Sequence, residues 1–333
     1  MLDRLKRVQE IDATGLEGLP DEASSAPLVL RGTVADWPFV REARRSDEAA
    51  VAYLRRFYNG QPVSALVAAP SEGGRFFYRP DSKTMNFETA SGLLADVLEA
   101  LLDQRADPDP AAIAMQAVSA PDCLPGLEEE NSNRFVPGGS HARVWIGNAV
   151  AVAPHFDVAE NIACVVAGRR RFLLFPPEQT ANLYPGPMDV TPANVPISMV
   201  AMDDSELDRF PRYREALTAA LVADLEPGDA IYIPYLWWHG VQSLGAFNVL
   251  VNYWFNRDEA AARYPFVPLL GLAFQVYRDL APKHRKAWRS LYDYYVFQTD
   301  ADPMEALVPA HRETGGTVDP ARLKRLLREI LGR

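Results

Sequence analysis

The chain has 333 residues, with 34 Lys and Arg against 44 Asp and Glu, for a formal net charge of −10. Hydrophobic residues make up 48% and charged residues 23%, a composition that excludes a disordered or fibrous chain. The acidic balance, with a sequence pI near 5.1, argues against a non-specific nucleic-acid binder and against a polybasic membrane binder. We therefore expect neither nucleic acid nor a membrane as a partner.

Cysteine content and the N-terminus indicate where the protein works. The two cysteines, Cys123 and Cys164, cannot form a disulfide framework, and such sparse usage fits a reducing compartment. The N-terminal residues lack the apolar segment of a secretory signal, and no run approaches the roughly 20 apolar residues of a membrane span. We expect a soluble, cytoplasmic protein.

The first third of the chain mixes strand and helix patterns. Pro27 to Val34 (PLVLRGTV) predicts a strand that ends at the turn residues 35–38. Further on, leucine and valine recur at helical spacing and predict a helix, through Leu93, Leu94, Val97, Leu98, Leu101 and Leu102. Residues 107–110 (DPDP) are typical of a loop.

Residues 142–256 have a different pattern, in which short apolar, β-rich runs alternate with Gly and Pro turns. Many short strands separated by such turns predict a sandwich or barrel. A helix is expected to interrupt them around Ser205 to Leu225. We therefore predict a mainly β protein with flanking helices, divided into residues 1–258 and a helical region over residues 259–333.

The helical region carries two amphipathic patterns. Trp288, Leu291, Tyr292 and Tyr295 fall on one helical face. In the last helix, Asp319 is suited to the cap and Pro320 to the first position, and an apolar stripe follows, made of Leu323, Leu326, Leu327, Ile330 and Leu331. This stripe either packs on its own domain or forms a homodimer.

His155, Asp157 and His239 are the candidate metal ligands. His155 and Asp157 lie at i and i+2 on a β-like run, so both side chains point to the same face. His239 lies 82 residues after Asp157, between strands that can bring it back beside the first pair. A lone His-x-Asp is a weak signal, but a carboxylate buried in an aliphatic strand is costly unless it is paired or metal-bound. Two imidazoles and one carboxylate leave open coordination positions that suit non-haem Fe(II).

The order of several segments resembles one family. The segments are WIGNAVAVAPHFDVAENIACVVAGRRRFLLFPPEQTANLYPGP, ELDRFP, EPGDAIYIPYLWWHGVQSL and VNYWF. They resemble the JmjC-type, cupin-like oxygenases, and most closely the branch that contains the asparaginyl hydroxylase factor inhibiting hypoxia-inducible factor. The resemblance covers most of residues 27–256. It implies a double-stranded β-helix, a jelly-roll relative, that uses Fe(II) and 2-oxoglutarate to hydroxylate a protein side chain or a small molecule.

The resemblance also implies roles for six residues. His155, Asp157 and His239 match the iron ligands of the family, and Asn161 and Asn252 match two asparagines near the metal-binding end of the cosubstrate. Arg170 stands where the family often has a lysine that holds the distal carboxylate of 2-oxoglutarate. A guanidinium can take this role because it is always charged and binds a carboxylate through two parallel hydrogen bonds. Alternation along a strand would turn Arg170 away from Arg169 and Arg171.

Two departures from the family pattern fall at the distal-carboxylate pocket. Val152 replaces a threonine, and the family's assisting tyrosine aligns near Ala114. Tyr78, Tyr232 or another aromatic hydroxyl could substitute for it. These departures leave a second hypothesis open, namely a metal-binding cupin that acts as a sensor or binding module without 2-oxoglutarate turnover. A scaffold that acts through its helical tail is a third. The Pro-rich connection from Tyr184 to Phe210 is expected to contact substrate.

Overall fold

The computed structural model describes residues 4–20, 25–80, 83–188, 190–191, 195–200, 202, 206–262 and 266–298, and the single positions 321, 324, 325 and 328. These residues belong to two compact units, Met1–Val267 and Pro268–Arg333. Among the described helices, none is long and apolar enough to cross a membrane.

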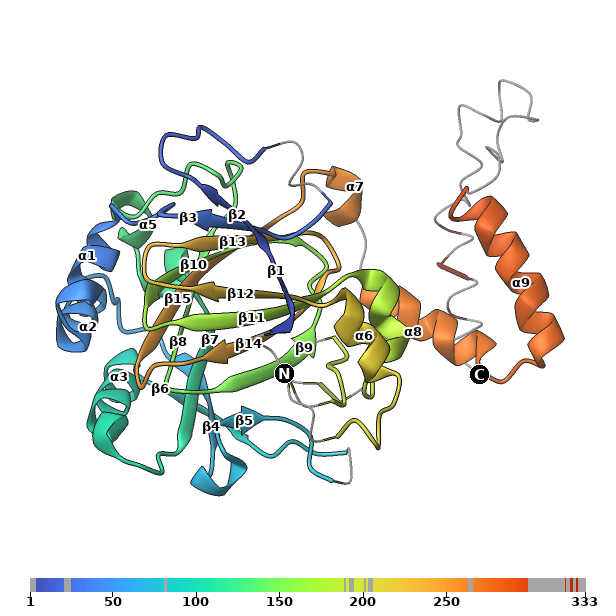
Figure 1. Ribbon diagram of the computed structural model, residues 1–333, viewed down its shortest axis with the longest axis horizontal. Coiled ribbons are helices and arrows are strands. Elements are labelled where there is room, and N and C mark those ends of the chain that lie inside the picture. Colours follow the sequence, from blue (N-terminus) through green and yellow to red (C-terminus); the bar gives the residue numbers. More distant parts are fainter. Residues whose placement is uncertain are drawn as a thin grey trace. The chain divides into compact units, whose positions relative to one another are not determined.

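The first unit is built on two β-sheets (Figure 1). The smaller sheet has the strand order β1-β12-β11-β14-β9-β5, with bounds β1 Lys6–Arg7, β12 Leu221–Leu225, β11 Arg170–Phe175, β14 Trp238–Ser243, β9 Ala151–His155 and β5 Arg75–Phe76. The larger sheet has the order β2-β3-β13-β10-β15-β8-β7-β4-β6, with bounds β2 Gln9–Asp12, β3 Leu28–Arg31, β13 Ala230–Ile233, β10 Glu160–Ala167, β15 Asn248–Phe255, β8 Ala142–Gly147, β7 Ala112–Ser119, β4 Val63–Ala68 and β6 Glu88–Gly92.

Strands β8 to β15 form the predicted barrel. The chain crosses repeatedly between the sheets, with β8, β10, β13 and β15 in the larger sheet and β9, β14 and the consecutive pair β11 and β12 in the smaller one. The pairs within this set are antiparallel. This is the arrangement of a double-stranded β-helix, a form of jelly roll. An apolar cluster packs strands of the two sheets against each other and includes Val165, Phe172, Leu174, Ile231 and Ile233.

Helices cover the outer faces of the sheets. The main apolar cluster packs the larger sheet against the N-terminal helices, which are α1 Pro38–Arg45, α2 Asp47–Arg55, α3 Leu94–Asp103, α4 Ala120–Cys123 and α5 Leu127–Glu130. Helix α2 begins where the Ser46 hydroxyl accepts a hydrogen bond from the Ala49 amide. Helix α3 matches the predicted leucine pattern and buries Leu94, Leu98 and Leu101. Short 3₁₀ turns occur at Pro70–Glu72, Gln104–Ala106 and Pro177–Leu183.

The predicted helix around Ser205 to Leu225 is right only in its middle, because residues 206–212 form turns and the last residues form a strand. Helix α6 spans only Tyr213–Ala219, and Leu221–Leu225 is strand β12. The strand forms because it pairs with β11, and because the Asp224 carboxylate receives hydrogen bonds from Arg171 and Arg7 across the sheet. Tertiary pairing therefore decides the conformation of these residues, as it commonly does for strands.

The C-terminal elements are helical, as predicted. Helix α7 spans Glu259–Ala262, α8 spans Phe266–Tyr277 and α9 spans Pro282–Tyr295. In α9, Trp288 and Tyr292 contact the ring of Tyr277. Leu291 and Tyr295 on the same helix are exposed. The predicted last helix, with its cap at Asp319 and Pro320 and its apolar stripe, lies outside the described residues.

Candidate functional site

Strands β9 and β14 bring the three predicted metal ligands together. His239 lies directly opposite His155 in the antiparallel register, and the two imidazole ring centroids are 4.4 Å apart. Asp157 follows β9, and its Oδ2 lies 3.6 Å from Nε2 of His239. Candidate ligand atoms of all three side chains lie within 4.8 Å of one another. A single metal ion can therefore reach all three.

The two imidazoles are oriented for metal binding by backbone carbonyls. Nδ1 of His155 lies 3.0 Å from the Ala153 carbonyl, and Nδ1 of His239 lies 3.1 Å from the Trp237 carbonyl. Since a carbonyl oxygen can only accept, Nδ1 carries the proton in each ring and Nε2 keeps its lone pair. Burial and the neighbouring His155 lower the pKa of His239, which keeps this ring neutral, as a ligand must be.

Asp157 is held by two side chains from the opposite sheet. The indole Nε1 of Trp254 donates to its Oδ2 at 2.8 Å, and Nδ2 of Asn161 donates to the same oxygen at 3.3 Å. Asn161 in turn accepts from Asn252 at 3.1 Å, and Asn252 accepts from the indole of Trp145 at 2.7 Å. Both hydrogen bonds therefore fall on Oδ2, the oxygen that lies 3.6 Å from Nε2 of His239, and they fix the carboxylate beside that ring.

The turn before β14 fixes the position of His239. Leu236 has a left-handed backbone conformation (φ 61°), and its amide donates to the Asp157 carbonyl at 3.2 Å. This strained conformation ties the segment of one candidate ligand to the segment of another. The pairing is also shifted between His239 and Val241, where β9 advances three residues, from His155 to Val152, against two on β14. Gly240 lies opposite this bulge in β9, and a Cβ atom there would collide with the Sδ atom of Met202.

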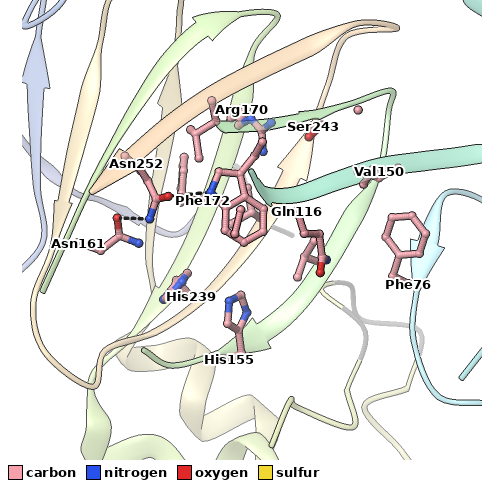
Figure 2. Close-up of a pocket in the computed structure, with 18 of the residues that line it drawn as sticks. Phe76, Gln116, Val150, His155, Asn161, Arg170, Phe172, His239, Ser243 and Asn252 are labelled. Carbon is pink, nitrogen blue, oxygen red and sulfur yellow. Dashed lines mark hydrogen bonds between the residues drawn. The ribbon is translucent and has the colours of Figure 1, made fainter. Parts of the chain in front are cut away.

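A cavity of about 380 Å³ extends from these three residues into the barrel, a volume typical of small-molecule sites. Figure 2 shows His155 and His239 at one end and Arg170 and Ser243 at the other. Arg170 pairs with Ser243 in the sheet, four residues along β14 from His239. This spacing separates the two ends by about 13 Å along the strand.

Arg170 points into the cavity while its neighbours point out. It is only 8% exposed, whereas Arg169 is exposed and Arg171 pairs with Asp224 on the outer face. The alternation predicted for these three arginines is therefore present. Nε of Arg170 is buried without a hydrogen-bond partner among the described residues, and burial lowers the pKa of this guanidinium to about 10. The group stays charged at neutral pH, and no carboxylate of the described residues pairs with it.

The side chains around Arg170 show which hydroxyl group is available in place of the family's threonine and tyrosine. Val152 and Ala114 both line the cavity, so the expected hydroxyls are absent from these positions. Tyr232 is directed elsewhere, because its hydroxyl bonds to Glu160 and Arg257. Among the described residues that line the cavity, none is a tyrosine, which leaves out both Tyr78 and Tyr232. The hydroxyl-bearing side chain paired across the sheet with Arg170 is Ser243.

Sequence reasoning missed four polar cavity residues, which are Trp145, Trp254, Gln116 and Ser243. Alternation from Asn252 to Trp254 on β15, and from His239 to Ser243 on β14, could have identified two of them. Gln116 could not be found this way, because strand β7 is bulged between Met115 and Val118. The extra residue changes which side chains face inward.

Comparisons with known proteins agree with this architecture. The cupin-like domain family matches residues 22–261. Human HSPB1-associated protein 1 is 32% identical over 155 residues, covering 45% of this chain and 31% of that protein. Lysine-specific demethylase JMJ31 of Arabidopsis thaliana is 34% identical over 120 residues, covering 36% of this chain and 21% of that protein. Human bifunctional peptidase and (3S)-lysyl hydroxylase JMJD7 is 28% identical over 274 residues, covering 73% and 81%. The chain thus spans less than a third of the first two relatives' own length.

Proposed function

Because this chain belongs to the cupin-like, JmjC-type domain family, we propose that it is an Fe(II)- and 2-oxoglutarate-dependent oxygenase that hydroxylates a protein side chain or a small molecule. Relatives named as a lysyl hydroxylase and as a demethylase support an oxygenase. The observation that carries the proposal is the cavity, which has a His-Asp-His cluster at one end and, at the other, a buried arginine that pairs with no carboxylate of the described residues.

The donor set fits Fe(II). His155 and His239 would each offer Nε2, and Asp157 would offer one carboxylate oxygen, a combination typical of non-haem iron oxygenases with open positions. Bound iron and 2-oxoglutarate would supply the oxidation of a C–H bond by O₂, with the cosubstrate converted to succinate and CO₂. The chain's own part is to hold the ligands in place before the metal arrives, through Trp254, Asn161 and the two backbone carbonyls.

Arg170, Asn161 and Asn252 would bind the cosubstrate. The guanidinium of Arg170 would hold the distal carboxylate, because an unpaired buried charge is costly and a carboxylate relieves that cost. Each asparagine amide donates one hydrogen bond within the network and keeps a second N–H that can orient the other end of the diacid. The interval of about 13 Å along β14, less the reach of the arginine side chain, is on the scale of a short dicarboxylate.

A spectroscopic experiment tests this proposal. Under anaerobic conditions, Fe(II) and 2-oxoglutarate together should give a weak visible charge-transfer band, and Asp157→Ala should abolish it. Absence of both the band and 2-oxoglutarate affinity in the wild-type protein would remove the oxygenase proposal.

A second candidate is a metal-binding cupin that senses or binds without turnover. Val152 and Ala114 favour it, since they leave the distal end of the cavity without the family's hydroxyls. Arg170 and the two asparagines oppose it. Measurement of succinate formation coupled to O₂ consumption separates the two candidates.

We also propose a division of labour along the chain. Residues 1–258 would form the catalytic domain, and residues 259–333 a helical region that forms a homodimer. Exposed apolar side chains on α8 and α9 support an interface, and include Leu269, Leu270, Phe274, Trp288 and Leu291. Light scattering on the full chain tests the dimer.

The connection from Tyr184 to Phe210, of which Ile197 lines the cavity, would contact substrate. Its shortening should reduce turnover of substrate more than uncoupled 2-oxoglutarate turnover.

A further inference from the structure

Arg143 is an arginine at the edge of the cavity that the proposed chemistry does not use. It lies on β8 two residues before Trp145, and its Cα pairs with that of Asn252 on β15. Its guanidinium lies 5.7 Å from the ring centroid of Trp254, and Nη1 reaches the Ala117 carbonyl at 3.5 Å. Trp254 and Ala117 both line the cavity. Arg143 therefore borders the cavity at the end where the indole of Trp254 bonds to Asp157.

The guanidinium of Arg143 has no acidic partner in the described part of the chain. Its one hydrogen bond there is the long contact to Ala117, although a guanidinium has five N–H donors. Arg257 provides a contrast, because its guanidinium and its amide both bond to the Glu160 carboxylate. Arg143 is half-buried against an aromatic face, and packing of this kind pre-orients the guanidinium.

The bulge in β7 adds a second polar group beside Arg143. Ala117 has a left-handed conformation (φ 50°) within the bulge, and its carbonyl is the one that Arg143 reaches. The preceding residue, Gln116, lines the cavity (Figure 2), and its amide has no hydrogen-bond partner among the described residues. The bulge thus presents the amide of Gln116 to the cavity, while the carbonyl of the following residue, Ala117, faces Arg143. One guanidinium and one amide match a planar, singly charged group better than a phosphate, which commonly draws several cations.

Resting on the proposed function, we infer that Arg143 recognises a carboxylate of the substrate close to the carbon that is oxidised. The substrate would be an acidic peptide side chain or a small carboxylic acid. A local arginine is needed for such a substrate because the chain's net charge of −10 repels anions at longer range. A cationic side chain such as lysine would be disfavoured at this edge by like charge.

The test compares the iron-loaded full chain with variants on peptide pools that each fix one residue as Asp, Glu, Asn, Gln, Lys or Arg. Succinate formation should be about tenfold higher with the acidic pools than with the basic pools, the range of a charged hydrogen bond. Arg143→Gln should remove this preference, Arg143→Lys should keep part of it, and Arg143→Glu should reverse it. Arg41→Glu, which makes the same charge change at an exposed position on α1, should leave the preference unchanged.

A second measurement separates this inference from the proposed function and from misfolding. Saturation-transfer NMR would measure binding of N-acetylglutamate and N-acetyllysine amide, with thermal unfolding as the check on folding. Uncoupled 2-oxoglutarate turnover with equal use of acidic and basic pools would overturn the role of Arg143 alone. If no 2-oxoglutarate is consumed, the proposed function fails. The inference about Arg143 fails as well if the wild-type protein binds N-acetylglutamate and N-acetyllysine amide equally and Arg143→Gln changes neither affinity. If the wild-type protein prefers N-acetylglutamate and Arg143→Gln loses this preference, the inference is supported whether or not 2-oxoglutarate is consumed. If no peptide pool is used as a substrate, the same result would point to a small carboxylic acid.

Discussion

The two ends of the cavity differ in how far the protein satisfies its own polar groups. At the metal end, Asp157 accepts from Trp254 and Asn161, and each imidazole bonds to a carbonyl. At the distal end, Nε of Arg170 is buried without a partner in the described chain. Buried polar groups in native proteins are normally paired. The end with His155, Asp157 and His239 is thus organised by the protein's own hydrogen bonds, whereas the end with Arg170 leaves a charge that the proposed carboxylate ligand would pair with.

Removal of a ligand at the organised end should have the largest effect. Asp157→Ala should lower Fe(II) affinity by more than the roughly 100-fold seen for residues outside the metal shell, because it removes one of three donors. Anaerobic Fe(II) titration measures this, with Asp208→Ala as the matched control at a fully exposed carboxylate. Retained Fe(II) affinity in Asp157→Ala would contradict the metal site.

Removal of the Arg170 charge should change 2-oxoglutarate affinity and protein stability in opposite directions. Arg170→Met should weaken 2-oxoglutarate binding by about 10- to 150-fold, the range of a charged hydrogen bond. It should also stabilise the ligand-free protein by on the order of 1–3 kcal/mol, because an unpaired buried charge is lost. Calorimetric titration and thermal unfolding measure the two effects.

The control for this prediction is Arg171→Met, which removes a neighbouring arginine that pairs with Asp224 outside the barrel. It should leave 2-oxoglutarate affinity unchanged.

The pH dependence of protein stability gives an independent check. Since burial holds the folded pKa of Arg170 at about 10, well below its ordinary value, the penalty of the buried charge is fully present well below pH 10. Above pH 10 the folded protein releases this proton before the unfolded chain does, so this contribution to stability should rise. A ligand-free protein that Arg170→Met destabilises would contradict the comparison.

Loss of one hydrogen bond behind the metal should have a smaller effect. Trp254→Phe removes the indole N–H that bonds to Asp157 and should lower metal affinity by about 10- to 100-fold. Trp37→Phe is the matched control, since its indole N–H also donates one hydrogen bond, to the Ser132 carbonyl, and the residue is absent from the cavity lining. Equal metal affinity in the two variants would show that Asp157 needs no such support.

The smallest effect is expected beside the site. The Tyr232 hydroxyl donates to Glu160 at 2.6 Å and accepts from Arg257 at 2.8 Å. Tyr232→Phe should therefore cost about 1–2 kcal/mol of unfolding free energy and leave Fe(II) affinity unchanged, as chemical denaturation and metal titration would measure. A fall in Fe(II) affinity would mean that the organised end extends further into β10 than the contacts of Asn161 indicate.

The sequence predicts the barrel and the convergence of His155, Asp157 and His239 well, because both follow from local alternation and from motif order. It also predicts that Arg170 alone of its triplet faces inward. It does not predict β12, because Asp224 becomes part of a strand only through Arg171 and Arg7. Gln116 and Arg143 are missed because a bulge in β7 creates their surroundings, and a bulge has no alternation signal.

The three arginines after the turn at Gly168 bear on how the cavity would respond to an insertion or deletion of one residue. A one-residue slip of a strand moves every side chain to the opposite face. On β9 such a slip would exchange His155 for Pro154 or Phe156 and would destroy the metal cluster. On β11, Arg169, Arg170 and Arg171 stand in a row, so that an insertion or deletion of one residue at Gly168 would still turn an arginine inward. If Arg170 binds the cosubstrate as proposed, an adjacent arginine could replace it after such a change, whereas no neighbour could replace His155. We therefore expect length variation among natural relatives to be accepted at this turn sooner than on β9.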